Sequence, residues 1–534
     1  MSANTQQERT EVIETINGPI KGIIRGDMQL FLGIPYAAPP TGKLRWRPPV
    51  TPAAWTEPLE AFTFGNVCAQ DALCFPGFGY ISSTEDCLYL NIFRPAHHER
   101  AQKLPVMVWI PGGGLFCGGS NDYDPTALVQ DGNVIFVSFN YRLNVFGFFS
   151  HPALNEEDHP GGNYGIMDQQ CALSWVQCNI ERFCGDTSNV TIFGESAGGI
   201  SVLSHLASPR STGLFHKAIV QSGGLPPTST FPNLKSLEQA GVAFASAAGC
   251  DSQTSENLRA IPTKKLMEAN AMPEGTFGTG QYYCGLIEDG TIIPVSMRQK
   301  FSAGEFNRVP LINGVNRDEY SWFQAMVELS TGQIVSNESY PGILANALTE
   351  AAQLGLLSMT IAPDTINEVL QRYPAEAHAT ASRALAAAIG DAGIISTSGR
   401  RTTRVIKQFV PDVYAYEFDV PESPVSWPKV SFPYGSAHTQ ELQYIFPLFH
   451  GASGTVQQLT EPQKHLAKQI VHYWTTFARR GTPNAETLAT LPAPYWPAYE
   501  TEQDNIMLLR APSAAATVAW GERHHSDFWD RFYV

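Results

Sequence analysis

The chain has 534 residues, of which 43% are hydrophobic and 16% are charged, and its formal net charge is −15. This composition is that of a globular chain that buries a core, which excludes intrinsic disorder. An acidic surface repels phosphate backbones, so the charge excludes nucleic acid as a partner.

The N-terminal segment and the cysteines restrict the class of protein further. The first ten residues (MSANTQQERT) lack the apolar core of a secretory signal, and no apolar run approaches the ~18–20 residues of a membrane span. We therefore predict a cytoplasmic protein without a membrane span, with secretion as the alternative. The nine cysteines show no metal-type spacing. This argues against a disulfide scaffold and against a metal site, and no cofactor is expected.

Apolar, β-branched runs predict a set of buried strands. The clearest are residues 104–110 (LPVMVWI), 133–138 (NVIFVS), 189–193 (NVTIF), 218–221 (AIVQ), 310–313 (PLIN) and 413–418 (VYAYEF). Near-continuous hydrophobicity is typical of parallel strands covered on both faces.

Helical segments alternate with these strands. Residues 165–183 place their apolar side chains on roughly one helical face. The alternation predicts an α/β fold with a central, mostly parallel sheet flanked by helices. Residues 234–408 are Ala-rich and more helical, so we expect a large helical insertion or cap region around the strand at 310. No linker divides residues 1–534, which we predict to form a single domain.

A run of three glycines follows the first of these strands. The segment 109–116 reads WIPGGGLF, and two more glycines follow at 118 and 119. Consecutive glycines cost conformational entropy, but they leave backbone N–H groups uncovered and able to converge on a developing oxyanion. The alternative is an ordinary loop at a strand end.

The strand at 189–193 runs directly into Gly194-Glu195-Ser196-Ala197-Gly198, and a stretch compatible with a helix follows. G-x-S-x-G alone occurs by chance in roughly one chain in four of this length. The order of strand, sharp turn and helix is that of a nucleophile elbow, which predicts Ser196 as a nucleophile and the Ala197 N–H as an oxyanion donor. The alternative is a glycine-rich turn with a capping serine.

A nucleophilic serine needs a base and an orienting carboxylate, which follow it in this order: serine, acid, histidine. His438 lies in a loop downstream of the strand at 413–418, where a catalytic histidine is expected. His524 lies in a polar segment near the end of the chain, which favours it less. For the acid, Asp318 and Glu319 both follow the strand at 310–313, and chemistry alone leaves both possible.

Several ordered motifs resemble the type-B carboxylesterase/lipase family, and the likeness extends from about residue 18 to 529. They are residues 31–37 (FLGIPYA), 44–46 (LRW), 84–91 (TEDCLYLN), 140–143 (NYRL), 194–199 (GESAGG), Trp474 and 477–478 (FA). The resemblance implies an α/β-hydrolase fold, and a serine hydrolase that cleaves small-molecule carboxylic esters through an acyl-enzyme.

The resemblance also implies roles for individual residues. It implies Glu319 as the acid, His438 as the base and Ser196 as the nucleophile. The other matched positions are the oxyanion donors Gly113, Gly114 and Ala197, the supporting residues Glu195 and Ser222, an Arg45–Glu85 ion pair and a Cys68–Cys87 disulfide.

Some residues depart from the family pattern. Pro111, Leu115 and Tyr320 differ from the residues that are common in relatives, and Asn257 falls near the position of a cysteine that would pair with Cys250. We expect Leu115 and Phe116 to line the substrate pocket.

Only 18 residues separate Cys68 from Cys87, too few for a large lipid-binding lid even though they include Phe75 and Phe78. Small to medium soluble esters are therefore favoured over triglyceride droplets. Two rival functions use the same fold. One is acyl transfer or lactonisation, and the other is a non-catalytic adhesion role, against which the intact Ser196, Glu319 and His438 argue.

Overall fold

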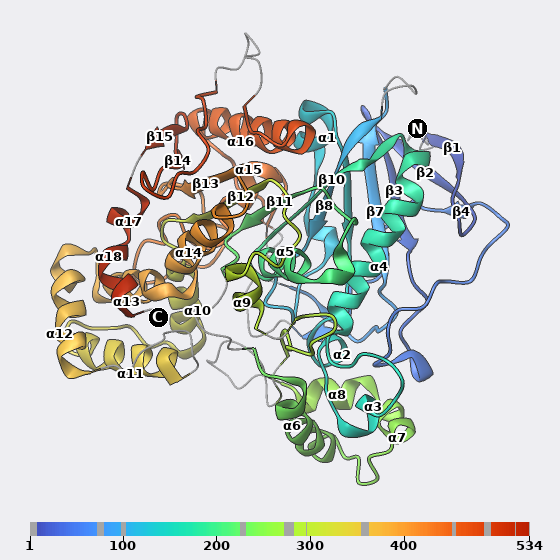
Figure 1. Ribbon diagram of the computed structural model, residues 1–534, viewed down its shortest axis with the longest axis horizontal. Coiled ribbons are helices and arrows are strands. Elements are labelled where there is room, and N and C mark those ends of the chain that lie inside the picture. The colour runs from blue at the N-terminus through green and yellow to red at the C-terminus, as the bar shows by residue number, and fades with distance from the viewer. Residues whose placement is uncertain are drawn as a thin grey trace, which may run out of the picture.

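The computed structural model describes residues 8–71, 79–97, 103–224, 231–271, 282, 284–294, 296–353, 362–450, 455–484, 493–517 and 519–532. Its centre is a 13-stranded sheet in the order β1-β2-β3-β7-β9-β8-β10-β11-β12-β13-β14-β15, with β4 beside β2 (Figure 1). The strands from β9 to β14 in this order run parallel, the strands from β1 to β9 and the pair β14–β15 are antiparallel, and β4 lies parallel to β2. The predicted α/β-hydrolase fold is confirmed.

The strands of this sheet are β1 (Arg9–Glu14), β2 (Pro19–Arg25), β3 (Met28–Pro35), β4 (Leu59–Glu60), β7 (Tyr89–Pro95), β8 (Leu104–Ile110), β9 (Ile135–Phe139), β10 (Gly185–Glu195), β11 (Lys217–Gln221), β12 (Leu311–Asn316), β13 (Val413–Phe418), β14 (Ile506–Leu509) and β15 (Ala515–Thr517). A separate two-stranded sheet joins β5 (Gln70–Asp71) to β6 (Ile81–Ser82).

The helices before β12 are α1 (Thr126–Gly132), α2 (Asn144–Gly147), α3 (Pro152–Asn155), α4 (Tyr164–Asn179), α5 (Ala197–Ala207), α6 (Leu234–Ala247), α7 (Ser255–Ala260), α8 (Thr263–Ala269) and α9 (Met297–Ser302). Those after it are α10 (Tyr320–Thr331), α11 (Tyr340–Gln353), α12 (Pro363–Arg372), α13 (Ala381–Ile389), α14 (Ser396–Lys407), α15 (Leu442–Ile445), α16 (Glu461–Arg480), α17 (Trp520–Arg523) and α18 (Ser526–Trp529).

The central strands are buried on both faces, which explains their near-continuous hydrophobicity. Along β8, Val106 and Val108 belong to the core cluster that includes residues of α4 and α5. The intervening Met107 and Trp109 belong to the cluster that includes residues of α1 and α16. Successive side chains of a strand point to opposite faces, so each strand contributes to two hydrophobic cores.

Two groups of helices flank β12 in the chain. Helices α6 to α9 precede this strand, and α10 to α14 follow it. In Figure 1, α6, α7 and α8 lie below the sheet, and α11, α12 and α13 lie to its lower left. The assignment of the whole chain to a single domain stays a prediction.

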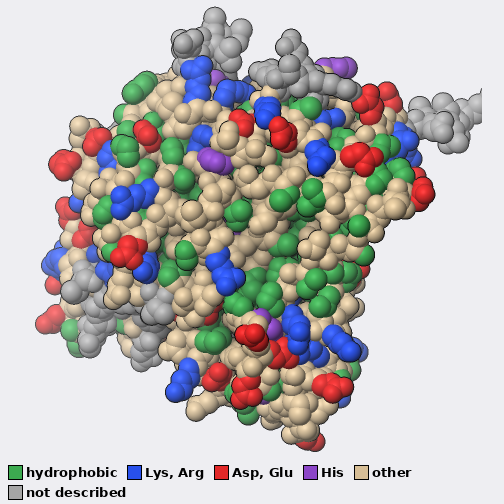
Figure 2. Space-filling model, turned by 45° about the vertical axis from the view of Figure 1, so that its right-hand side comes forward, with side chains coloured by type: hydrophobic (Ala, Val, Ile, Leu, Met, Phe, Trp, Pro, Cys, Tyr) green, Lys and Arg blue, Asp and Glu red, His purple; other side chains and the backbone are tan. Residues whose placement is uncertain are grey.

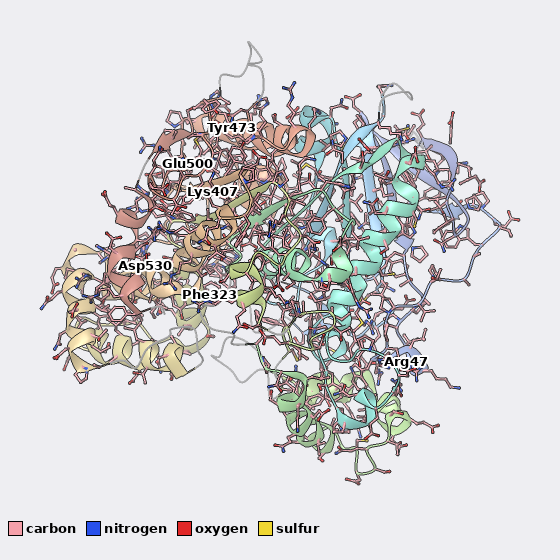
Figure 3. All side chains as sticks on the ribbon, viewed as in Figure 1. Arg47, Phe323, Lys407, Tyr473, Glu500 and Asp530 are labelled. Carbon is pink, nitrogen blue, oxygen red and sulfur yellow. A yellow bond between two sulfur atoms is a disulfide. The ribbon has the colours of Figure 1, made fainter. Side chains whose placement is uncertain are left out.

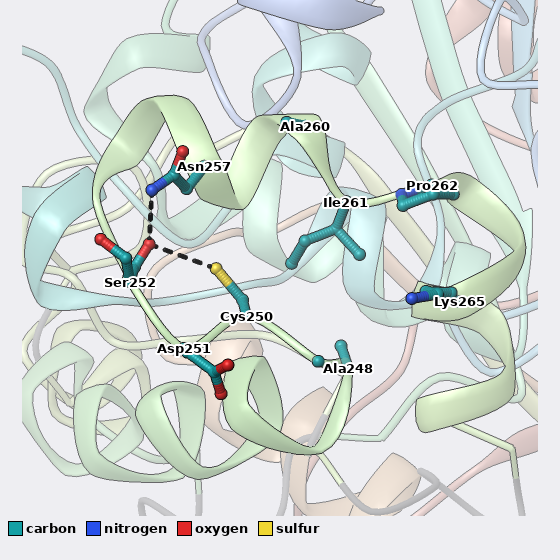
Figure 4. Close-up of a pocket in the computed structure, with 10 residues that line it drawn as sticks. Ala248, Cys250, Asp251, Ser252, Asn257, Ala260, Ile261, Pro262 and Lys265 are labelled. Atoms are coloured by element: carbon teal, nitrogen blue, oxygen red, sulfur yellow. Dashed lines mark hydrogen bonds between the residues drawn. The ribbon is translucent and has the colours of Figure 1, made fainter.

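Cys68 and Cys87 form a disulfide, as the family resemblance implies. The two cysteines have a sequence separation of 19, and closing a loop of this length stabilises the fold by about 3 kcal/mol in the chain-entropy treatment. Cys250 is a free, buried thiol close to the carbonyl of Ser252. Asn257, which stands near the position of the relatives' cysteine, donates its side-chain amide to the same carbonyl at 2.8 Å (Figure 4).

The C-terminal segment is held against α14 by ion pairs. Arg400 bonds to Asp504 at 2.9 Å and to Asp530 at 2.8 Å. Lys407, seven residues further along α14, bonds to Glu500 at 3.1 Å, and the labels of these two residues lie close together in Figure 3. The space-filling view shows acidic and basic side chains interspersed over the face that it draws (Figure 2).

His524 makes a second attachment, deeper in the protein. Its Nδ1 lies 2.5 Å from the carboxylate of Asp391 and its Nε2 lies 2.5 Å from that of Glu417, on β13. Arg523 bonds to the other oxygen of Glu417 at 2.5 Å. The side chain of His524 is only 3% exposed, so this residue of a polar terminal segment is anchored inside the fold. Its carboxylate partners lie more than 100 residues away in the chain.

The surroundings of His524 favour its charged form. Burial by itself lowers the pKa of an imidazole, but the Asp391 and Glu417 carboxylates outweigh it and raise the pKa of His524 to about 10. The hydroxyl of Tyr373 also donates to Asp391 at 2.9 Å, and Arg523 also pairs with Asp419 at 2.7 Å. A group whose pKa is raised on folding stabilises the fold fully below its unfolded pKa of about 6.5 and loses that contribution as the pH rises through about 10.

We therefore expect His524→Gln to lower the free energy of unfolding at pH 7 by about 3–5 kcal/mol, because an uncharged amide leaves two buried carboxylates without a cation. Urea titration at pH 7 measures the loss, and titration above pH 10 should show a smaller difference from wild type. His525→Gln is the matched control, since His525 is exposed and its replacement should change stability by less than about 0.5 kcal/mol. Equal effects of the two substitutions would contradict the assignment.

Candidate active site

Ser196 lies at the sharp turn between β10 and α5. Its backbone has φ 58° and ψ −123°, a left-handed conformation that costs a non-glycine residue on the order of 1–3 kcal/mol. Its N–H donates to the carbonyl of Gln221 at 2.9 Å. A β-carbon on Gly198 would lie 2.1 Å from the carbonyl oxygen of Ile110, and one on Gly194 would lie 2.6 Å from the backbone of Gly198. The two glycines of the motif therefore permit the strand and helix to approach this closely.

The glycine loop, which we define as residues 112–119, passes directly beside this turn. A β-carbon on Gly112 would lie 2.7 Å from the carbonyl oxygen of Glu195 and 3.4 Å from Cβ of Ser196. Gly113 has φ 107°, and a β-carbon there would lie 2.1 Å from the carbonyl oxygen of Cys117. The structure thus brings the predicted oxyanion loop and the predicted nucleophile together at the carboxyl ends of β8 and β10.

The carboxylate of Glu319 faces the predicted base. Glu319 comes just after β12 and is 1% exposed. Its Oε1 accepts the backbone N–H of Asn316 at 2.7 Å, and its Oε2 lies 2.6 Å from Nδ1 of His438.

Asp318 points to other partners. It forms an ion pair with Arg383 and accepts the backbone N–H of Ser436 at 2.9 Å. The sequence leaves both carboxylates possible as the acid, and Glu319 is the one bonded to the imidazole. Asp318 instead stabilises the loop that precedes His438.

His438 is 2% exposed and is surrounded by carboxylates and aromatic rings. Its Nε2 lies 3.3 Å from Oε1 of Glu195, the residue before Ser196. Burial by itself lowers the pKa of this imidazole, but the charges of Glu195 and Glu319 outweigh burial and raise the pKa to about 9. The ring of Phe323 lies 5.1 Å from that of His438, and the ring of Trp322 lies 6.1 Å away (Phe323 is labelled in Figure 3).

Two further carboxylates lie near the imidazole. Burial, together with the charges of Glu441 and Glu319, holds the pKa of Glu195 well above its usual range, although His438 opposes this shift. Burial and the charge of Glu319 raise the pKa of Glu441 to about 7. The site can therefore carry fewer negative charges at neutral pH than its carboxyl groups suggest, which limits repulsion around the imidazole–Glu319 pair.

Asn316 connects the predicted acid to the loop of the predicted base, and the sequence alone gives it no role. Besides the backbone bond to Glu319, its side-chain amide donates to the carbonyl of Ala437 at 2.7 Å and to Glu441 at 2.6 Å. Ala437 immediately precedes His438, so one residue fixes the turn of the acid and the loop of the base. No local pattern identifies the contact between Asn316 and Glu441, because it joins positions that are 125 residues apart.

The remaining predicted residues lie around this centre. Ser222 follows β11 with φ 51°, and its N–H donates to Gly314 at 2.8 Å. Leu115 has φ 67° and is 5% exposed, and its carbonyl accepts the N–H of Asn144 at 2.8 Å. Phe116 packs against the aromatic cluster that contains Trp322.

The structure also describes two of the residues that differ from the family pattern, and the ion pair that the resemblance implies. The carbonyl of Pro111 accepts the hydroxyl of Tyr141 at 2.9 Å. The ring of Tyr320 stacks on that of Phe323 at 5.5 Å. Arg45 and Glu85 form the implied ion pair at 2.5 Å. Phe75 and Phe78 lie outside the described residues.

Within the described residues, no cluster of three His, Cys, Asp or Glu side chains could hold a metal ion. Among the same residues, no helix is long and apolar enough to cross a membrane.

Comparisons with known proteins agree with this geometry. The model of the Carboxylesterase family matches residues 9–529. The chain is 33% identical to the cocaine esterase of Homo sapiens over 96% of this chain and 88% of that protein, and 32% identical to an acylcarnitine hydrolase of Mus musculus over 98% and 91%. A solved structure of PNB esterase superposes with a TM-score of 0.77 at 28% identity, covering 97% of this chain and 99% of that one. The chain therefore belongs to the carboxylesterase family and is a serine hydrolase of carboxylic esters.

Proposed function

We propose that Ser196, His438 and Glu319 are the catalytic triad of this ester hydrolase. One observation carries the proposal. The ring of His438 places Nδ1 2.6 Å from the Glu319 carboxylate, while Nε2 faces the elbow, 3.3 Å from Glu195, the neighbour of Ser196. A base held on one nitrogen by a carboxylate, with its other nitrogen beside the residue that precedes a strained serine, supports the arrangement that acyl transfer needs.

The reaction proceeds in two halves. The Ser196 hydroxyl attacks the ester carbonyl carbon while Nε2 of His438 takes its proton, and Glu319 stabilises the resulting imidazolium. The C–O bond to the alcohol then breaks, and His438 returns the proton to the leaving oxygen. A water molecule attacks the acyl-enzyme by the same route, which releases the carboxylic acid and restores the Ser196 hydroxyl.

The N–H groups of Gly113, Gly114 and Ala197 bind the oxyanion in both halves. The close approach of the glycine loop to the elbow supports this assignment, since Gly112 lies against Glu195 and Ser196. Ala197 is the first residue of α5, whose N-terminal end adds a favourable dipole. Glu195 and Ser222 support the site from beside the imidazole and the end of β11.

The substrates are small to medium esters with an apolar group near the reacting carbon. The Trp322 and Phe323 rings beside His438, with Phe116 in the same aromatic cluster and Leu115 in the glycine loop, supply an apolar lining. The names of the relatives, cocaine esterase and acylcarnitine hydrolase, describe esters with bulky or apolar parts. The cytoplasmic location stays a prediction, and the Cys68–Cys87 disulfide supports the secreted alternative.

Covalent labelling tests the proposal directly. We expect a fluorophosphonate probe to label the native protein once per chain, and peptide mass spectrometry to place the label on Ser196. The pretreated protein should no longer hydrolyse p-nitrophenyl acetate. Labelling at another residue, or turnover by fully labelled protein, would contradict the triad. Product analysis in the presence of a competing alcohol separates hydrolysis from acyl transfer.

A further inference from the structure

Gln70 is a buried side chain that joins the disulfide loop to the glycine loop. The disulfide loop is the segment that Cys68 and Cys87 close, and the structure describes residues 68–71 and 79–87 of it. Gln70 lies in β5 and is 0% exposed. Its Nε2 donates to the carbonyl of Gly118 at 2.9 Å, and its Oε1 accepts the N–H of the same residue at 2.8 Å.

The other two hydrogen bonds of the Gln70 amide are made within the disulfide loop. Nε2 also donates to the carbonyl of Cys68 at 3.1 Å, and Oε1 also accepts the N–H of Tyr80 at 3.1 Å. Both donors and both acceptors of the amide are thus satisfied. A buried amide that grips both backbone groups of one glycine fixes that glycine in position and in orientation, and loss of the amide leaves buried backbone groups without partners.

Gly118 in turn contacts the start of the glycine loop. It has φ 99°, and a β-carbon there would lie 2.7 Å from the carbonyl oxygen of Gly112. Within the loop, the carbonyl of Gly113 accepts the N–H groups of Phe116 and Cys117 at 3.1 and 3.0 Å. A shift of Gly118 would therefore displace the tight turn that carries Gly113 and Gly114.

Neighbouring contacts show that the two loops form one assembly. The side-chain amide of Asn144 donates to the carbonyl of Ala69 at 2.8 Å, while its backbone N–H donates to the carbonyl of Leu115 at 2.8 Å. The hydroxyl of Tyr80 bonds to the buried carboxylate of Asp122, just past the glycine loop. Ala69, the neighbour of Gln70, is thus linked through Asn144 to the glycine loop, and Tyr80, whose N–H donates to Gln70, is anchored just after that loop.

We propose that Gln70 is a positioning residue for ester hydrolysis, acting through Gly118 to hold the N–H groups of Gly113 and Gly114 where the oxyanion forms. This inference rests on the proposed function of those two glycines. Gln70 does not touch the substrate. Because an oxyanion donor is worth about 10²–10³ in kcat, a partial displacement of two donors should cost about 10- to 100-fold in kcat and little in KM.

The test compares Gln70→Ala with a matched control, Gln170→Ala. Gln170 is also a buried glutamine, but its amide donates to the hydroxyls of Ser208 and Ser211. We expect Gln70→Ala to lower kcat for p-nitrophenyl acetate by about 10- to 100-fold with KM within about threefold. The affinity for a trifluoromethyl ketone, whose hemiketal oxygen occupies the oxyanion position, should fall by a similar factor. Gln170→Ala should lose thermal stability and keep kcat and ketone affinity.

Gln70→Met keeps the length of the side chain without its hydrogen bonds and serves if the alanine variant does not fold. The inference is overturned if a folded Gln70 variant keeps its kcat and ketone affinity, if only KM changes, or if Gln170→Ala loses kcat equally. The proposed function has its own readout in the same samples. Failure of the wild-type protein to be labelled at Ser196 by a fluorophosphonate overturns the triad, whereas normal labelling with an inert Gln70 overturns only the role of Gln70.

Discussion

Ser196→Ala should reduce kcat/KM for p-nitrophenyl acetate by about 10⁴- to 10⁶-fold, because the acyl-enzyme can no longer form. What remains is the catalysis that an oxyanion site supplies to direct attack by water. Release of p-nitrophenol measures this residual rate, and the variant preparation must be free of wild-type enzyme.

The fold should tolerate this change. The Ser196 side chain makes no capping hydrogen bond to α5, so its removal leaves the helix start as it is. Ser204→Ala is the matched control on the same helix, where the hydroxyl only donates to the carbonyl of Ile200 at 2.9 Å. We expect Ser204→Ala to keep full activity. Comparable loss in both variants, with both folded by circular dichroism, would show that the effect does not come from the nucleophile.

The parts of the fold that could be predicted from sequence are those with a local signal. The buried parallel strands, such as 104–110 and 413–418, are continuous apolar runs, and the structure places β8 and β13 at those residues. The elbow has glycines at fixed distances from Ser196 because the close contact of β10 with α5 excludes side chains. The antiparallel strands β1 to β3 could not be predicted in this way, because polar or partly exposed residues interrupt their apolar runs.

Contacts between distant segments could not be predicted in this way. Gln70 meets Gly118 across 48 positions, and His524 meets Glu417 across 107. Neither residue differs locally from an ordinary polar residue, since a side chain's role here depends on what the folded chain places opposite it. The proposed triad acid shows the same limit, because Asp318 and Glu319 are neighbours on one turn, and only the direction of each side chain distinguishes them.

Glu319 faces His438 and Asp318 faces Arg383, so we expect Glu319→Gln and Asp318→Asn to differ in their effect on kcat/KM. Glu319→Gln should lower kcat/KM by about 10³- to 10⁴-fold, because an amide donor facing Nδ1 of His438 favours the tautomer that cannot accept the serine proton. Asp318→Asn should leave kcat/KM within about threefold. It weakens the ion pair with Arg383 and should lower stability by about 1–3 kcal/mol.

The pH–rate profile adds a readout that a general loss of structure would not produce. The base acts when it is neutral, so kcat/KM should rise with pH through the pKa of His438. Glu195 and Glu319 raise this pKa to about 9. Removing the charge of Glu319 removes stabilisation of the imidazolium and must lower that pKa. The acid limb of the residual activity of Glu319→Gln should therefore move to lower pH, while that of Asp318→Asn stays in place. A shift produced by Asp318→Asn instead would assign the acid to the neighbouring residue, against the geometry in which Asp318 faces Arg383 and Ser436.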